Sequence, residues 1–100
     1  MRQVRATDEV KRYAVNLVRA TRTAPGVQLG ASPRASLALV GAAQALALFD
    51  GQTFVSPEHV QELAVSVIAH RLALDPQARF SGATAVAVVE EVVKTVAVPA

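Results

Sequence analysis

The chain has no cysteine and no tryptophan, and only 4% of its 100 residues are aromatic. Without cysteine, neither a disulfide framework nor a cysteine-ligated zinc site can form. The hydrophobic content is nevertheless 52%, mostly alanine, valine and leucine, which favours closely packed helices over a sheet core and argues against disorder. We therefore expect a single all-α domain, since this length of chain is one domain's worth.

Long hydrophobic runs are also missing. The longest one, residues 37–49, is interrupted by Gln44 and falls short of the roughly 20 residues that a membrane span needs. The N-terminus is charged and lacks the apolar segment of a secretory signal. We expect a cytoplasmic protein with no membrane partner.

The sequence carries few residues for catalysis. It has no phosphate-binding GxxxxGK[ST] loop, no HExxH motif and no nucleophile elbow. His59 and His70 lie eleven residues apart with no obvious third ligand, so we interpret them as ordinary helix-surface or helix-end residues and expect no metal site. No two carboxylates are paired for acid–base work. The isolated chain is therefore not expected to be an enzyme.

Hydrophobic periodicity and capping signals predict a four-helix bundle. Residues 1–6 read as a tail or linker remnant, and residues 7–100 as a helical domain in which Thr7 caps the first helix. A loop is expected from Asp75 to about Gly82, and two very short strands are possible near residues 27–29 and 71–74. The helices are expected at about residues 8–22, 33–49, 57–70 and 84–97.

The second of these helices is apolar on nearly every side. Such a helix is typically surrounded by other elements, so we place it in the middle of the bundle. Its start is marked by Ser32 as a candidate N-cap and by Pro33 at the first helical position, and its end by Gly51. The same Ser-Pro signal recurs at Ser56.

Arg34 departs from this pattern, because it places a cation in the first turn of a helix, against the helix dipole. A helix N-terminus attracts phosphate, and a guanidinium adds a permanent charge with several donors. Gly30 allows the backbone to approach closely and Ser32 offers a hydroxyl. Residues 30–34 are therefore a candidate anion site, and the alternative is a solvated surface arginine.

Two further features admit both structural and functional readings. Tyr13 falls on the apolar stripe of the first helix, where a core residue with its hydroxyl at the edge is the simpler interpretation. The opposite face of that helix is basic, which is typical of a solvated face but is also compatible with nucleic-acid binding or protein docking. Exposed aromatics for base stacking are missing. The basic residues are Lys11, Arg12, Arg19 and Arg22.

Three segments resemble the C-terminal lid domain of the MoxR family of AAA+ ATPases. They are YAVNLVRATR at residues 13–22, PGVQLGASPRASLALVGAAQALALFDG at residues 25–51, and FVSPEHVQELAVSVIAHRLAL at residues 54–74. The resemblance implies that Arg34, in GASPRA, is the sensor 2 arginine that reaches the ATP phosphates. Tyr13, Arg22, His70 and Arg71 also match positions of the family pattern, with no role assigned.

The resemblance also implies what the chain works with. ATP and magnesium would be held by an AAA+ core that carries the Walker A and Walker B motifs, and neither motif is present here. The expected partners are that core, neighbouring subunits of a homo-oligomeric ring with six members, and a von Willebrand factor A-domain protein. The lid would close over bound nucleotide in a chaperone-like ATPase.

Overall fold

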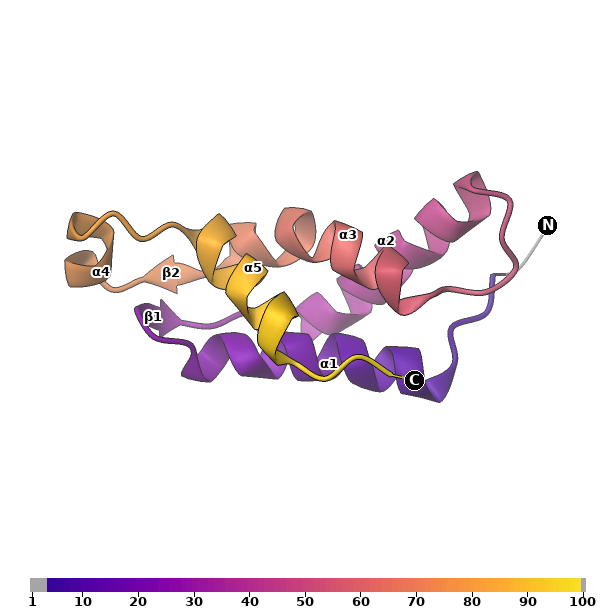
Figure 1. The fold of residues 1–100 in the computed structure, drawn as a ribbon, viewed down its shortest axis with the longest axis horizontal. Coiled ribbons are helices and arrows are strands. Elements are labelled where there is room, and N and C mark those ends of the chain that lie inside the picture. Colours follow the sequence, from indigo (N-terminus) through magenta and orange to yellow (C-terminus); the bar gives the residue numbers. More distant parts are fainter. Residues whose placement is uncertain (1–3, 100) are drawn as a thin grey trace.

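The computed structural model describes residues 4–99, which form an elongated body of 47 × 22 × 20 Å (Figure 1). Helices account for most of it, and a pair of short strands lies toward one end, so the all-α prediction is confirmed. The helices are α1 (Asp8–Thr23), α2 (Arg34–Phe49), α3 (Pro57–Ile68), the 3₁₀ turn η1 (Ala69–Arg71), α4 (Pro76–Phe80) and α5 (Ala85–Thr95). The strands are β1 (Val27–Leu29) and β2 (Ala73–Leu74).

Helix α1 begins where the sequence predicts. The Thr7 hydroxyl oxygen accepts a hydrogen bond from the Val10 amide over 3.2 Å, and Asp8 and Glu9 occupy the first turn, where the dipole favours acids. Its apolar stripe is buried, including Tyr13 and Leu17. The basic side chains on the opposite face are exposed.

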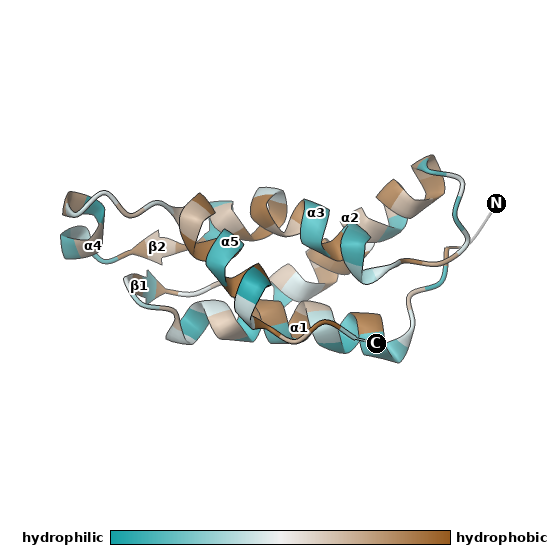
Figure 2. Ribbon diagram, in the orientation of Figure 1, coloured by the Kyte–Doolittle hydropathy of each residue, from teal (hydrophilic) through white to brown (hydrophobic). Residues whose placement is uncertain are grey.

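Helices α1 and α3, and not α2, form the middle of the bundle. Each of these two helices contacts the other and also contacts α2 and α5, whereas α2 packs on α1 and α3 through one face. That face consists mostly of alanines, with Leu39 among them, and small side chains allow the helices to approach closely. The outer face is open: Leu37 is 74% exposed and Phe49 is 88% exposed. Apolar residues continue along α2 to its last turn (Figure 2).

The connection from α2 to α3 is fixed by His59. Its amide donates to Ser56 Oγ over 3.3 Å, while its Nδ1 accepts from the Ser56 amide over 3.0 Å, which makes a reciprocal capping box. Its Nε2 lies 3.4 Å from Asp50 Oδ2 at the end of α2. Of the two interpretations that the sequence allowed, His59 is therefore the helix-end residue and not the surface residue, because its ring is buried between the end of α2 and the start of α3.

The predicted strands are present as an antiparallel pair. Val27 pairs with Leu74 and Leu29 with Ala73, with an irregularity between the two pairs. The segment after β2 is not the predicted loop throughout. Asp75 accepts from the Gln77 amide over 3.1 Å and Pro76 takes the first helical position, so that one short helix, α4, forms.

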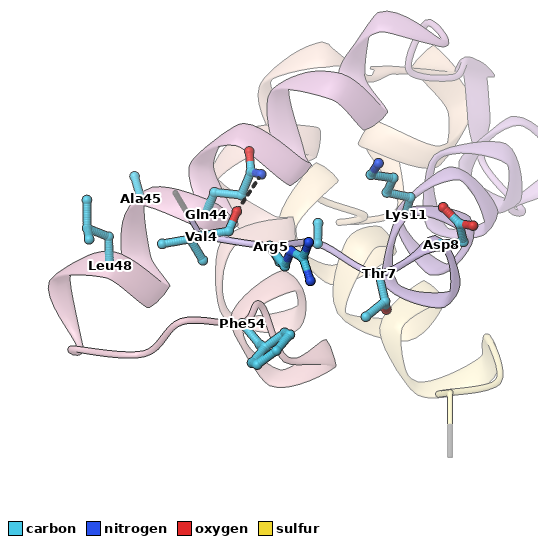
Figure 3. Close-up of a pocket in the computed structure, with 10 residues that line it drawn as sticks. Val4, Arg5, Thr7, Asp8, Lys11, Gln44, Ala45, Leu48 and Phe54 are labelled. Atoms are coloured by element: carbon cyan, nitrogen blue, oxygen red, sulfur yellow. Dashed lines mark hydrogen bonds between the residues drawn. The ribbon is translucent and has the colours of Figure 1, made fainter. Parts of the chain in front are cut away.

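Val4 and Arg5, in the segment predicted as a tail or linker remnant, are hydrogen-bonded to other parts of the chain. The Arg5 amide donates to the Thr53 carbonyl over 3.0 Å, and the Arg5 carbonyl accepts from the Val55 amide over 2.8 Å, forming a parallel bridge. Gln44 Nε2 donates to the Val4 carbonyl over 3.1 Å (Figure 3). The N-terminal segment is thereby attached to α2 and to the α2–α3 loop. The predicted tail also included residues 1–3, which lie outside the described residues.

The last helix closes the bundle on the side of α1 and α3. Thr84 caps it by accepting from the Ala87 amide over 3.1 Å, and Val89 and Val92 are buried against the core. Glu90 and Glu91 face outward, as the helical period predicts. Within residues 4–99, no helix is long and apolar enough to cross a membrane.

Candidate functional site

Arg34 is the first residue of α2 and its side chain is exposed. Among residues 4–99 its guanidinium makes neither a hydrogen bond nor an ion pair. A permanently charged, multi-donor group is thus presented at a helix end with its donors available. The geometry fits contact with an anion supplied from outside the chain.

The start of α2 differs from the predicted cap. Pro33 is the N-cap, in the right-handed helical region, and no side chain caps the helix. The Ser32 carbonyl accepts from the Ala35 amide over 2.9 Å, and the Pro33 carbonyl accepts from the Ser36 amide over 3.2 Å. The prediction of Ser32 as a side-chain cap is therefore wrong, because the helix begins one residue later than predicted, with Pro33 as its N-cap.

These backbone bonds change the expected chemistry. A helix N-terminus binds anions through amides that lack partners. Here the Ala35 and Ser36 amides are already satisfied. Attraction of an anion to this end therefore depends mainly on the Arg34 side chain, and less on the helix backbone than the sequence suggested.

The loop before α2 is held tightly against the last turn of α1. The Ala31 amide donates to Thr21 Oγ1 over 3.2 Å, and the Ala31 carbonyl accepts from Arg22 Nε over 3.4 Å. A Cβ added at Gly30 would lie 2.7 Å from Arg22 Cγ and 2.8 Å from its Cα. Gly30 is thus required for the loop to lie close to α1. The sequence had suggested that this glycine would allow the backbone to approach an anion.

Thr21 was not singled out from the sequence. It is completely buried, and its hydroxyl donates to the Val18 carbonyl over 2.6 Å while accepting from Ala31. Its position on the apolar stripe, at helical spacing from Leu17 and Val18, is the signal that it is buried. A buried hydroxyl needs a partner, but a carbonyl of its own helix can supply one, so the sequence does not indicate the bond to Ala31.

A shallow hollow of about 690 Å³ lies beside this loop. Arg22 and Arg71 contribute to its lining together with Gly30, Ser32 and the proline that precedes Arg34. Arg71 Nη1 donates to the Val67 carbonyl over 2.6 Å, which fixes this side chain against α3. The structure thus brings Arg22 and Arg71 to the same loop that carries Arg34.

The other predicted positions do not join this site. Tyr13 is buried and its hydroxyl accepts from Gln61 Nε2 over 3.1 Å, which is the core role expected of it. His70 is exposed in η1 and does not line the hollow. In the part of the chain that the structure describes, no cluster of histidine, aspartate or glutamate could hold a metal ion.

A larger hollow of about 890 Å³ lies near the other end of α2 (Figure 3). Arg5 and Lys11 line it together with apolar residues such as Leu48 and Phe54. None of the residues around Arg34 contributes to it. The two hollows are separate features of the surface.

Comparison with known proteins identifies the family of this fold. A family model described as AAA lid domain matches residues 19–92, which include the end of α1, the loop and all of α2 and α3. The chain belongs to the AAA lid domain family. The lid domain is 38% identical over 96 residues to the chaperone MoxR1 of Mycobacterium tuberculosis, covering 87% of this chain and 26% of that protein. The predicted resemblance to the lid of a MoxR-family AAA+ ATPase is confirmed.

Two further proteins are similar to the lid domain, one in sequence and one in structure. The lid domain is 46% identical over 99 residues to YeaC of Bacillus subtilis, a protein without a characterised function, covering 99% of this chain and 31% of that protein. A solved structure of a proposed ATPase from Cytophaga hutchinsonii superposes with a TM-score of 0.91 at 28% identity, covering 98% of the lid domain and 32% of that chain. The lid domain spans about a third or less of the length of these relatives.

Proposed function

We propose that this lid domain closes over ATP bound by an AAA+ core and that Arg34 contacts the nucleotide phosphates as the sensor 2 arginine. The observation that carries the proposal is the Arg34 side chain, exposed and without a partner among residues 4–99, at the start of a helix whose loop is bonded to α1. Family membership supplies the context, because an AAA lid works beside a nucleotide site.

The residues near Arg34 have different proposed roles. Gly30 lets the loop lie on α1, and Ser32 adds an exposed hydroxyl beside the hollow. Arg22 and Arg71 add positive charge to the same surface. ATP and its magnesium ion are held by the core, where Walker motifs supply the phosphate and metal ligands. The lid domain contributes no metal ligand in this proposal.

The partners follow from the same proposal. The lid domain acts in the cytoplasm, joined to its own core, and lies next to neighbouring subunits of a ring, which we propose has six members. Closure over the γ-phosphate and release after hydrolysis would be transmitted to those neighbours. A von Willebrand factor A-domain protein is the proposed co-acting partner of the chaperone-like ring. Without the core, the lid domain does not hydrolyse ATP.

Substitution of Arg34 in the full-length ATPase tests the proposal. Arg34→Ala removes the charge that faces the phosphates, and we expect ATP turnover to fall by at least about tenfold, corresponding to roughly 1.4 kcal/mol in the barrier. Arg34→Lys keeps a charge but loses the planar donor fork, so its turnover should be intermediate. Steady-state ATPase assays measure both.

Arg19→Ala is the matched control, because Arg19 is an equally exposed arginine that belongs to the basic face of α1 and not to the start of α2. Its turnover should equal that of the wild type. Melting temperatures of all variants should agree, since both arginines are exposed. Unchanged turnover in Arg34→Ala would overturn the sensor 2 proposal.

A further inference from the structure

We propose that Thr21 is a positioning residue for Arg34: its hydroxyl fixes the loop that carries the arginine to the end of α1. This inference rests on the proposed sensor 2 role. Thr21 itself reaches no solvent and therefore no nucleotide, since its side chain is completely buried. Any effect of Thr21 on ATP turnover must pass through the loop.

The hydroxyl joins two segments that are distant in sequence. It donates to the Val18 carbonyl within α1 over 2.6 Å, which occupies its proton and leaves its lone pairs to accept. It then accepts from the Ala31 amide over 3.2 Å, so that one group is both held by α1 and bonded to the loop. Ala31 is also completely buried. The bond therefore forms away from water, where an unpaired amide is costly.

The contact restrains the loop at a short distance along the chain from Arg34. Ala31 and Arg34 are separated by only two residues, and one of them is Pro33, whose ring restricts the backbone. Arg22 Nε donates to the Ala31 carbonyl, so both polar groups of Ala31 are bonded to consecutive residues of α1. The start of α2, including the Cα atom of Arg34, is therefore fixed relative to α1.

Positioning of this kind matters for a phosphate contact. A displacement of about 1 Å in a group that faces the reacting atoms can lower a rate by roughly 100-fold. Without the Thr21 hydroxyl, the Ala31 amide would either remain buried without a hydrogen-bond partner or move to reach solvent. The loop would then adopt several conformations, and the position of Arg34 would vary among them.

The test uses Thr21→Val, which keeps the size and branching but removes the hydroxyl, and Thr21→Ser, which keeps the hydroxyl. In the full-length ATPase we expect kcat for Thr21→Val to fall by about 10–100-fold, and Thr21→Ser to stay close to the wild type. If Thr21→Val melts below the assay temperature, Thr21→Cys takes its place, because a thiol is a weak acceptor of similar size.

A double-mutant cycle separates positioning from a general loss of structure. In an Arg34→Ala background the loss caused by Thr21→Val should disappear, because the residue it positions is gone. An equal loss in both backgrounds, or wild-type kcat in Thr21→Val when Arg34→Ala alone is impaired, would overturn this inference and leave the sensor 2 role standing. Wild-type turnover in Arg34→Ala itself would overturn both.

Discussion

At the residue scale, Gly30 shows how closely the site loop is packed. A methyl group at this position would meet the backbone of Arg22 at 2.8 Å, and backbone cannot give way as the end of a flexible side chain can. We expect Gly30→Ala to lower the free energy of unfolding by about 1–3 kcal/mol through overpacking. Chemical denaturation of the purified chain measures this change.

Gly41 provides the matched control. It lies inside α2 with nothing within 4 Å of an added Cβ, so Gly41→Ala removes a flexible residue without a clash. The free energy of unfolding should rise by about 0.5–1 kcal/mol. If both substitutions stabilised the protein alike, the loop would not lie against α1 as described.

The sequence revealed Arg34 but not the residues that hold it. Arg34 could be recognised because a cation in the first turn of a helix breaks a local rule. Thr21 broke no local rule, since threonine near the end of a helix is common, and its partner Ala31 has no distinctive side chain. A hydrogen bond from a side chain to a backbone amide ten residues away leaves little trace in the sequence.

At the scale of elements, the Ser-Pro pattern predicts the N-cap correctly for α3 and incorrectly for α2. Ser56 caps α3 with its side chain, as the pattern predicts. Ser32 does not cap α2, because Ala31 is fixed to α1 and the chain enters the helix through backbone turns at Ser32 and Pro33. The same Ser-Pro dipeptide therefore begins a helix in two different ways, and the tertiary contacts of the residue before it decide which one forms.

A pair of alanine substitutions checks this difference. Ser56→Ala removes a side-chain cap and should lower the free energy of unfolding by about 0.5–2 kcal/mol. Ser32→Ala removes no hydrogen bond within residues 4–99 and should change it by less than about 0.5 kcal/mol. Both values come from denaturant titrations of the same protein preparation. A loss in Ser32→Ala equal to that in Ser56→Ala would restore Ser32 as a cap.

At the scale of the whole molecule, the α-helical class and the strand pair were predictable because periodicity and turn residues determine them locally. The place of α2 in the bundle was not. A helix that is apolar on every side gives no sign of which face turns inward. The buried face of α2 is set by tertiary packing against α1 and α3, which also contact each other and α5.

Leu37 and Leu39 test which face of α2 belongs to the core. Leu39 is fully buried, so Leu39→Ala should lower the free energy of unfolding by about 2–5 kcal/mol. Leu37 is 74% exposed, and its truncation should cost less than about 0.5 kcal/mol. If Leu37→Ala destabilised the chain as strongly, a second copy would have to cover the outer face. The melting temperature would then rise with protein concentration, because association stabilises the folded form by mass action.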